Sequence, residues 1–506
     1  MRQLTSLDAQ FLAIEDDRNH GHVGSIAIYD PSTAPGELVT LADVKAMLAA
    51  RMHLLEPFRW KLVEVPFGLD YPYWIECEVD LDYHVRELAL PAPGDLRQLA
   101  AQTARIFERA LDRDHPLWEM YLIQGLEGGR IGVLSKVHHA ALDGLSGAEI
   151  LVTLLDLEPT GREIPPPDPE RRPATQPGRA ELLARGLVGV PRHALSALRT
   201  LPTTLPNLDL VPTLRSLPGV GALAGASRRV SGLVPGGENL ATEHRLAPKT
   251  SFNRRISGHR RVALTTVSLS EVKRIKNHLG VTVNDVVIAI TAGAVREWLI
   301  KHDEIHADPL LAMVPVSVRL PEEFGTYGNR VSMMVVPIPT DTADPAQRVE
   351  QSHEAMLTAK DRHQHTPRML MQEAYEVIPP LMMAGTARAL LAIAGTGAVN
   401  PPLNLIISNI PGSPVPLYCM GAKLEANFPL SAITDGMGLN LTIISYMDRI
   451  DFGIVGDREE VPDVWYLAEE IDRAYEELRE LLPEVPPAPA AAPSRRAKRP
   501  KAKQPT

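Results

Sequence analysis

The residues of this chain with the clearest capacity for chemistry are two adjacent histidines, His138 and His139, followed by Asp143 and Gly144. An imidazole can take a proton from a hydroxyl group near neutral pH and return it to a leaving group. Asp143 could orient a ring, pair with an arginine or cap a helix, and Gly144 permits a positive φ or the close approach of another chain. These residues indicate acid–base chemistry, against the plainer alternative of two histidines at a core edge with a capping aspartate.

The elements around this motif are predicted to be a hairpin and a helix. Apolar residues dominate 118–124 and 130–137, and the glycine-rich segment 125–129 between them predicts a turn. From Leu145 to Leu154 apolar residues recur at a helical interval. We therefore expect both histidines on a strand-to-helix connection, where folds commonly present reactive side chains.

Length, charge and cysteine content narrow the class of protein. The chain has 506 residues, 44% of them hydrophobic, which is more than one core usually supports and predicts two domains. A net charge of −10 argues against nucleic acid as a partner. Cys77 and Cys419 lie far apart, so we expect neither a disulfide framework nor a cysteine-based metal site. No secretory signal pattern is seen at the N-terminus, which favours a cytoplasmic protein.

Composition divides the chain into four parts. Residues 1–157 form a mixed N-terminal domain that carries the histidine motif, including a predicted helix over 96–111. Residues 158–258 form a linker and crossover, with proline and charge dominating 158–179. A second domain spans 259–482, and the proline-, alanine- and lysine-rich tail 483–506 is expected to be disordered.

The crossover contains a basic, apolar segment over 182–235. Six arginines and one acidic residue lie among apolar residues that prolines interrupt, in an otherwise acidic protein. This contrast favours a segment that lies on a membrane surface. A crossover that merely packs on the second domain is an equally weighted alternative.

The second domain mixes helices and strands as the first does. Ser268 and Glu271 resemble a capping box before a helix over 272–279 that Gly280 ends, and a mostly buried helix follows over 282–298. Strands are predicted around 311–318, 331–338, 403–408 and 439–446. Both halves therefore belong to the α+β class, as two-layer structures.

Other features carry less weight. His302 and His306 lack the glutamate that a zinc protease helix needs, and the glycines of 219–225 lack both the spacing and the strand of a dinucleotide loop, so we expect no metal site or bound nucleotide cofactor there. No G-x-S-x-G elbow occurs, which counts against a serine esterase. The apolar stretch 381–399 is long enough to suggest a membrane span, but its glycines and alanines favour a buried helix.

The motif His138-His139-xxx-Asp143-Gly144 resembles the HHxxxDG signature of the CoA-dependent acyltransferase superfamily. Around it, the chain resembles the bacterial wax ester synthase/acyl-CoA:diacylglycerol acyltransferase family in particular. Pro116-Leu117-Trp118 resembles that family's PLW segment, and 283–289 resembles its NDVVLA segment. Further ordered likenesses run from residue 3 to residue 478, and they lie at 4–12, 22–24, 314–319, 328–330, 408–412 and 439–446.

This resemblance implies two chloramphenicol-acetyltransferase-like lobes with the active site in a channel between them. It implies an enzyme that moves a long-chain acyl group from acyl-CoA to diacylglycerol, with fatty alcohols as a second acceptor, at the surface of the inner membrane or of lipid inclusions. In that mechanism His139 is the general base beside His138, and no cofactor is needed because acyl-CoA is a substrate. Asp143 pairs with an arginine, for which Arg319 is the candidate, and Gly144 leaves room for the pantetheine arm or the acceptor.

The resemblance also implies roles for five further residues, and for two of them a structural role is an alternative. Asn284 is expected near the tetrahedral oxyanion, and Asp285, Pro116, Leu117 and Trp118 near substrate. For Asn284 and Asp285 the alternative is the start of a helix, which these residue types favour anyway.

Two other functions stay open at this point. One is a relative of the same fold that condenses chains delivered on carrier proteins, and the other is a lipid-binding protein without catalysis. The PLW and NDVV segments disfavour the first, and the intact motif disfavours the second.

Overall fold

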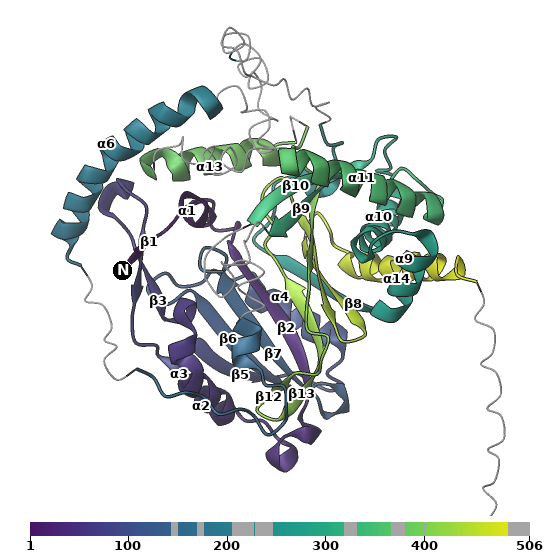
Figure 1. Ribbon diagram of the computed structural model, residues 1–506, viewed down its shortest axis with the longest axis horizontal. Coiled ribbons are helices and arrows are strands. Elements are labelled where there is room, and N and C mark those ends of the chain that lie inside the picture. The colour runs from purple at the N-terminus through teal and green to yellow at the C-terminus, as the bar shows by residue number, and fades with distance from the viewer. Residues whose placement is uncertain are drawn as a thin grey trace, which may run out of the picture.

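The computed structural model describes residues 1–142, 150–168, 177–204, 227, 246–317, 331–365, 380–397 and 400–483. Within these ranges the chain forms two lobes, each built on a six-stranded mixed sheet, and a small three-stranded sheet beside the N-terminal lobe (Figure 1). The predicted α+β class with two lobes is confirmed.

The N-terminal sheet carries the histidine motif at the end of a central strand. Its strands, in spatial order, are β12 (Tyr418–Cys419), β13 (Ala422–Leu430), β2 (His22–Asp30), β7 (Ile131–His138), β6 (Trp118–Gln124) and β5 (Val85–Ala89). β6 and β7 form the predicted antiparallel hairpin, in which Trp118 lies opposite Val137. On the other side, β2 places His22 opposite His138. The strand that ends in His138 is therefore fixed by hydrogen bonds to a neighbour on each side.

Short helices and a small sheet complete the N-terminal lobe. The helices are α1 (Ser6–Ala13), α2 (Leu41–Arg51), α3 (Leu81–His84) and α4 (Leu96–Phe107), and the small sheet is β1 (Arg2–Gln3), β4 (Tyr73–Glu76) and β3 (Trp60–Val63). Short 3-10 turns of this lobe lie at Pro31–Thr33, Pro35–Glu37, Met52–Leu54, Glu56–Arg59, Pro66–Gly68 (η5) and Glu127–Gly129, and a further one at Ser251–Asn253 precedes β8 (Arg260–Ser268) of the C-terminal lobe. The predicted helix over 96–111 is confirmed as α4, although it ends earlier, at Phe107.

The C-terminal sheet has the order β10 (Val331–Ile338), β9 (Leu310–Ser317), β11 (Leu405–Ile410), β14 (Leu439–Tyr446), β15 (Arg449–Asp457) and β8 (Arg260–Ser268). The four strands predicted in this region are confirmed within a few residues at each end. Its helices are α9 (Leu269–Leu279), α10 (Val283–Lys301), α11 (Pro345–His365), α13 (Pro380–Gly395) and α14 (Val464–Glu480). Ser268 caps α9 by accepting the N–H of Glu271, which is one half of the predicted capping box, and α9 begins at Leu269, three residues before the predicted start. Gly280 ends the helix as predicted, in the left-handed conformation.

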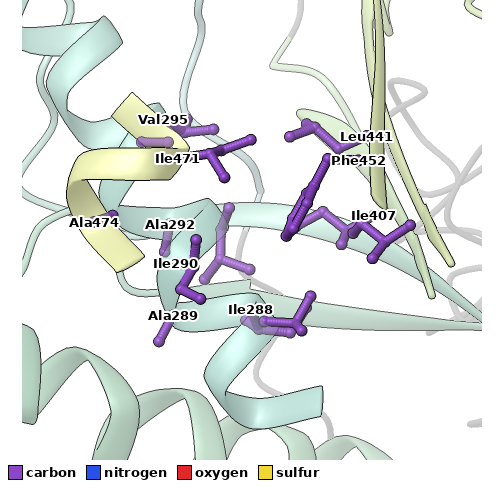
Figure 2. Packing of buried hydrophobic residues seen from close by; sticks show 14 of the residues in the cluster. Ile288, Ala289, Ile290, Ala292, Val295, Ile407, Leu441, Phe452, Ile471 and Ala474 are labelled. Atoms are coloured by element: carbon purple, nitrogen blue, oxygen red, sulfur yellow. The ribbon is translucent and has the colours of Figure 1, made fainter. Parts of the chain in front are cut away.

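The core of the C-terminal lobe is organised around α10. Figure 2 shows Ile288, Ile290 and Ala292 of α10 in one cluster with Phe452 of the sheet and Ile471 of α14. A Cβ atom on Gly293 would lie only 3.0 Å from the Cβ atom of Ala474, so glycine permits the close approach of α10 to α14. The prediction of a mostly buried helix over 282–298 is confirmed. This packing holds the first turn of α10 in a fixed position.

The two lobes are joined by an exchanged strand and a shared helix. β13 comes from the C-terminal half of the sequence but pairs with β2 in the N-terminal sheet, so the lobes do not divide strictly at the linker. α4 is buried between the lobes, where Phe107 and its neighbours contact side chains of both sheets. Both connections fix the end of β7 relative to the C-terminal lobe.

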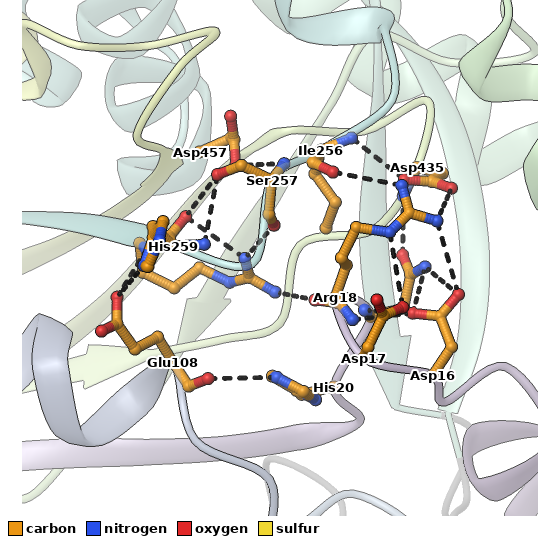
Figure 3. Close-up of polar contacts among 12 residues, drawn as sticks. Asp16, Asp17, Arg18, His20, Glu108, Ile256, Ser257, His259, Asp435 and Asp457 are labelled. Carbon is orange, nitrogen blue, oxygen red and sulfur yellow. Dashed lines mark hydrogen bonds and ion pairs between the residues drawn. The ribbon is translucent and has the colours of Figure 1, made fainter.

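A polar joint between the lobes adds to these connections (Figure 3). Arg18 lies 3.5 Å from Asp435 and donates to the carbonyl oxygen of Ile256, while the guanidinium of Arg260 donates back to the carbonyl oxygen of Arg18. Burial lowers the pKa of Arg260 to about 10. The Arg18 loop leads directly into β2, so this joint connects the C-terminal lobe to the strand beside β7.

The segment 381–399 is not the buried helix that its composition favours. It forms α13 over Pro380–Gly395, but only Met383 and Gly395 are buried, whereas Leu381 and Met382 are 59% and 60% exposed. α13 lies across α1 on the outside of the molecule, where Met383 packs on Ala9 and Tyr71. The contact covers one side of α13 and leaves apolar side chains on its other side exposed.

The crossover begins with a long helix. α6 (Arg179–Thr204) runs past two prolines and packs on the loop that contains η5, where Gly186 lies close to Val65 and Leu69. The structure describes 177–204 and Ser227 of this region, so the rest of the basic segment 182–235, the tail from 484 onward and the linker stretch 169–176 lie outside the described residues. Among the described helices, none is by itself long and apolar enough to cross a bilayer. α9 and α10 pass that test of length and composition only as a pair, across a 102° bend.

Candidate active site

His138 is a buried residue whose two ring nitrogens are both engaged. Its Nδ1 atom accepts a hydrogen bond from the backbone N–H of Ala140 at 3.1 Å. Its Nε2 atom lies 3.0 Å from Oε1 of Glu15, and the residue is 1% exposed. The first histidine of the motif is therefore held in place as a structural element.

Glu15 connects this histidine to the loop before β2. It accepts hydrogen bonds from the backbone N–H of Gly21 and from Nη2 of Arg113, each at 2.8 Å. Burial alone would raise the pKa of Glu15, but the bonds from His138, Arg113 and Gly21 outweigh it and lower the pKa to about 2. Sequence reasoning missed Glu15, because an acidic residue just after a short helix carries no signal of burial.

His139 is half-buried and presents its ring differently. The ring stacks on that of Phe11 from α1, with centroids 4.0 Å apart and planes 11° from parallel. The backbone N–H of His139 donates to the carbonyl oxygen of Gly21 at 2.8 Å. A Cβ atom on Gly21 would lie 2.8 Å from the carbonyl oxygen of Phe11 and 2.9 Å from Nε2 of His138, so a larger residue would disturb both histidines. His139 is thus the better placed of the two to meet a ligand.

The Pro116-Leu117-Trp118 segment supports the motif from behind. The carbonyl oxygen of Leu117 accepts the backbone N–H of His138 at 2.9 Å. The indole N–H of Trp118 donates to the carbonyl oxygen of Phe58 at 2.8 Å, and its ring stacks on those of Phe58 and His84. All three residues are buried, so their described contacts position β7 and leave the expected substrate contact untested.

A buried polar group lies beside the motif on β2 and β7. Lys136 is fully buried, and its ammonium donates to the carbonyl oxygens of Ile106 and Arg109 at the end of α4. Burial lowers its pKa to about 8. Burial, and then the nearby Lys136, hold the pKa of His22 well below its usual value, so His22 is a neutral neighbour of the motif.

In the C-terminal lobe, Asn284 lies in the first turn of α10 but does not cap it. The capping box is made by Thr282 and Asp285, whose side chain and backbone groups bond reciprocally. Asp285 is 1% exposed, and its Oδ2 atom also lies 2.7 Å from Nδ1 of His353. In this structure Asp285 is a helix-capping residue, and it does not line the neighbouring cavity as a substrate-binding role would suggest.

The side chain of Asn284 is oriented by a second asparagine. Nδ2 of Asn409 donates to Oδ1 of Asn284 at 3.0 Å, which turns the NH₂ group of Asn284 toward the sulfur of Met356 at 3.9 Å. This weak contact leaves the amide with donor capacity for a ligand. Asn409 was not singled out for its side chain, since only its place in the 408–412 segment marks it in the sequence.

Asn284 and Asn409 line a cavity of about 630 Å³. The described residues of its wall come from α9, α10, α11, β11, β14 and β15 or lie next to them, and they are Leu269, Lys273, Thr282, Val283, Asn284, Val287, Lys360, Asn409, Pro411, Gly412, Ser413, Pro414, Ser445, Met447 and Ile450. A volume of this order suits a ligand of cofactor size.

The two candidate catalytic side chains, His139 and Asn284, are contacted by residues of different lobes. Phe11 and Gly21, which contact His139, belong to the N-terminal lobe, whereas Asn409 and Met356, which contact Asn284, belong to the C-terminal lobe. Asp143, Gly144 and Arg319 lie outside the described residues, so their expected roles stay predictions. Within the described ranges, no group of three His, Cys, Asp or Glu side chains is arranged to hold a metal ion.

Two lobes, each built on a mixed sheet, define a class of folds that other solved structures share. The first condensation domain of the calcium-dependent antibiotic synthetase matches 96% of this chain and 98% of its own, with a TM-score of 0.53 and 17% identity. This is a likeness of fold alone, and it confirms the expected chloramphenicol-acetyltransferase-like architecture.

Within that class, the chain belongs to the wax ester synthase/diacylglycerol acyltransferase family. The family's catalytic domain matches residues 4–287, and its C-terminal domain matches 327–479. The solved wax ester synthase/diacylglycerol acyltransferase from Marinobacter aquaeolei VT8 covers 95% of this chain with 99% of its own, at a TM-score of 0.66 and 26% identity.

Two Mycobacterium tuberculosis proteins carry provisional names as diacylglycerol O-acyltransferases. One is 35% identical over 92% of each chain, and the other is 33% identical over 94% of this chain and 98% of its own. The protein is an acyltransferase of this family.

Proposed function

We propose that this protein transfers a long-chain acyl group from acyl-CoA to diacylglycerol to form triacylglycerol, and that it also accepts fatty alcohols to form wax esters. The observation that carries the proposal is the half-buried ring of His139 at the end of β7, beside a fully engaged His138. The names of the mycobacterial and Marinobacter relatives support the choice of substrates.

In the proposed reaction His139 serves as the general base. It removes the proton of the acceptor hydroxyl while that oxygen attacks the thioester carbonyl, and the tetrahedral intermediate forms without a protein nucleophile. The C–S bond then breaks, and the protonated His139 returns the proton to the CoA thiolate. Asn284 donates to the oxyanion, and Asp143 with Arg319 holds the loop after the motif.

The direct test uses purified protein with palmitoyl-CoA and either diacylglycerol or hexadecanol. Triacylglycerol or palmityl palmitate, together with an equal amount of free CoA thiol, is the expected outcome. Absence of both esters under conditions where the folded protein is stable would overturn the proposal. Ester formation from an acylated carrier protein but not from acyl-CoA would favour the condensation-type alternative.

We also propose that the enzyme works at a lipid surface. Five exposed apolar residues lie on η5 and on the two helices that contact it, α6 and α13, and we name them the apolar platform: Phe67, Leu187, Val188, Leu381 and Met382. Phe67 is 81% exposed and has a positive φ of 60°, which a large side chain rarely adopts. α13 lies on α1, and Phe11 of α1 stacks on His139, so α1 lies between the platform helix α13 and the active site. Long-chain substrates would reach the enzyme from that surface.

A further inference from the structure

The cavity beside Asn284 has a rigid wall. A Cβ atom on Gly412 would lie 1.8 Å from the carbonyl oxygen of Ser445, so the loop after β11 packs directly on β14. The backbone N–H of Gly412 donates to the Ser445 hydroxyl at 3.2 Å, and the backbone N–H of Met447 donates to the carbonyl oxygen of Ser413 at 2.8 Å. The cavity is therefore a preformed feature of the C-terminal lobe.

The charged side chains that line this cavity, among the residues that the structure describes, are all positive. Fifteen described residues form its wall, of which Lys273 and Lys360 are charged, and none of the fifteen is a carboxylate. In the described part of the chain neither lysine forms an ion pair, whereas the nearby Glu271 is paired with Arg274 at 2.8 Å. Two unpaired cations around a cavity, in a protein of net charge −10, indicate an anionic ligand.

We infer that this cavity binds the phosphorylated nucleotide end of the acyl-CoA donor, with Lys273 and Lys360 contacting its phosphate groups. The inference rests on the proposed function and deepens it by assigning the donor to one side of the molecule. A phosphate monoester carries about −1.5 to −2 charges near pH 7, and CoA adds a pyrophosphate to one such group. Lysine serves as a point charge for such groups.

The position of the cavity agrees with this assignment. Asn284, the expected oxyanion donor, lines the same cavity as both lysines, so a thioester near Asn284 and phosphates near the ammonium groups belong to one ligand. A neutral diacylglycerol or alcohol has no group that would use the two cations. The acceptor is therefore assigned to the other side, toward the apolar platform.

Binding is tested without turnover. Isothermal titration with 3′,5′-ADP compares the wild type with Lys273→Ala/Lys360→Ala and with a control, Lys61→Ala/Lys301→Ala, which removes two positive charges that do not line the cavity. We expect the dissociation constant to rise at least tenfold in the cavity variant and to stay within twofold in the control. Equal affinities of the wild type and the cavity variant would overturn the inference. Inorganic phosphate is titrated in parallel, and equal affinity for phosphate and 3′,5′-ADP would also overturn it by showing a general anion site.

A kinetic arm separates this inference from the proposed reaction. In the cavity variant, KM for palmitoyl-CoA should rise at least tenfold, while turnover of palmitoyl-pantetheine, which lacks the nucleotide, should match the wild type. A protein that binds 3′,5′-ADP through the lysines but forms no ester would contradict the proposed function and leave the cavity assignment standing. An active enzyme whose KM for palmitoyl-CoA is unchanged in the cavity variant would contradict the cavity assignment and leave the proposed function standing. Lys273→Glu/Lys360→Glu repeats the test with charge reversal, and both positions are exposed, so the fold should tolerate it.

Discussion

Nε2 of His138 lies 3.0 Å from Oε1 of Glu15, and this contact gives the two histidines of the motif different roles. Because Glu15 also holds the Gly21 N–H and Arg113, His138 is one member of a buried polar network. His139 stacks on Phe11 and remains partly exposed, so its ring is the better placed of the two to approach a substrate. The structure therefore predicts different consequences for the same substitution at neighbouring positions.

The first prediction compares His139→Ala with His138→Ala. Loss of His139 should reduce acyl transfer to background, since a positioned general base contributes ~10²–10⁴-fold. His138→Ala should keep measurable activity, because one imidazole suffices for both proton steps, but it should unfold more easily. Steady-state assays with palmitoyl-CoA and diacylglycerol, together with urea unfolding, measure both effects. Equal rates for wild type and His139→Ala would refute the mechanism.

The second prediction concerns the pH dependence of stability through Glu15. Its folded pKa of about 2 lies below the ordinary value of 4.5, so the unfolded chain binds more protons between those pH values. The stability that Glu15 contributes is therefore fully present above pH 4.5 and is lost as the pH falls toward 2. A shift of this size corresponds to about 3 kcal/mol. Glu15→Gln should lower the free energy of unfolding by an amount of that order at pH 7.

The matched control is Glu64→Gln. Glu64 contacts the same Arg113 at 3.2 Å, but its side chain is 64% exposed, so its loss should change stability by under about 1 kcal/mol. Urea unfolding at pH 7, 5 and 3 should show the gap between wild type and Glu15→Gln narrowing at the lowest pH. A gap that stays constant from pH 7 to pH 3 would show that Glu15 acts through packing alone.

Several strands of both sheets could be predicted because apolar residues dominate or alternate along each of them, between turn residues. β6, β10 and β14 match their predicted bounds at both ends. β13 could not be assigned to the N-terminal sheet in this way, since its partner β2 lies at the other end of the chain. Pairing over such a separation depends on the whole fold, which local patterns do not encode.

The parts of the site that sequence reasoning missed share a physical cause. Glu15 and Asn409 are ordinary polar residues in the sequence, and only the fold places one against His138 and the other against Asn284. α13 is the opposite case: its apolar composition predicts a buried helix, but most of the helix is not buried. Composition reports what a helix could bury, whereas burial depends on what covers it, and α1 covers only one side.

The third prediction distinguishes a catalytic role of Asn284 from a structural role at the start of α10. Asn284→Ala should lower kcat by ~10²–10³-fold if its amide donates to the oxyanion. It should leave thermal stability almost unchanged, because Thr282 and Asp285 form the cap. Asn409→Ala should lower kcat by a smaller factor, since it only orients Asn284. Thr282→Ala provides the comparison, with a loss of about 1 kcal/mol in stability. A large loss of stability in Asn284→Ala with unchanged kcat would support the structural role.

The last prediction concerns the apolar platform. If the enzyme docks on lipid through η5, α6 and α13, then Phe67→Asn/Leu187→Ser/Met382→Ser should release it from vesicles, because each large apolar side chain that leaves water contributes about 1.5–3 kcal/mol when fully buried. Asparagine at position 67 tolerates the positive φ, so this variant should fold as well as the wild type. Co-sedimentation with phosphatidylcholine–phosphatidylglycerol vesicles should weaken at least tenfold.

Turnover should depend on how the acceptor is presented. The platform variant should acylate vesicle-borne diacylglycerol slowly and a soluble short-chain alcohol at the wild-type rate, since His139 and Asn284 are untouched. A control, Leu38→Ser/Ile305→Ser/Leu357→Ser, removes three exposed apolar residues from elsewhere on the surface and should bind vesicles as the wild type does. If both triple variants lost vesicle binding equally, general surface hydrophobicity would explain it. If neither variant lost vesicle binding, the platform would not contact lipid. α6 would then be a crossover that only packs on the protein, and the exposed apolar side of α13 would bind something other than a lipid surface.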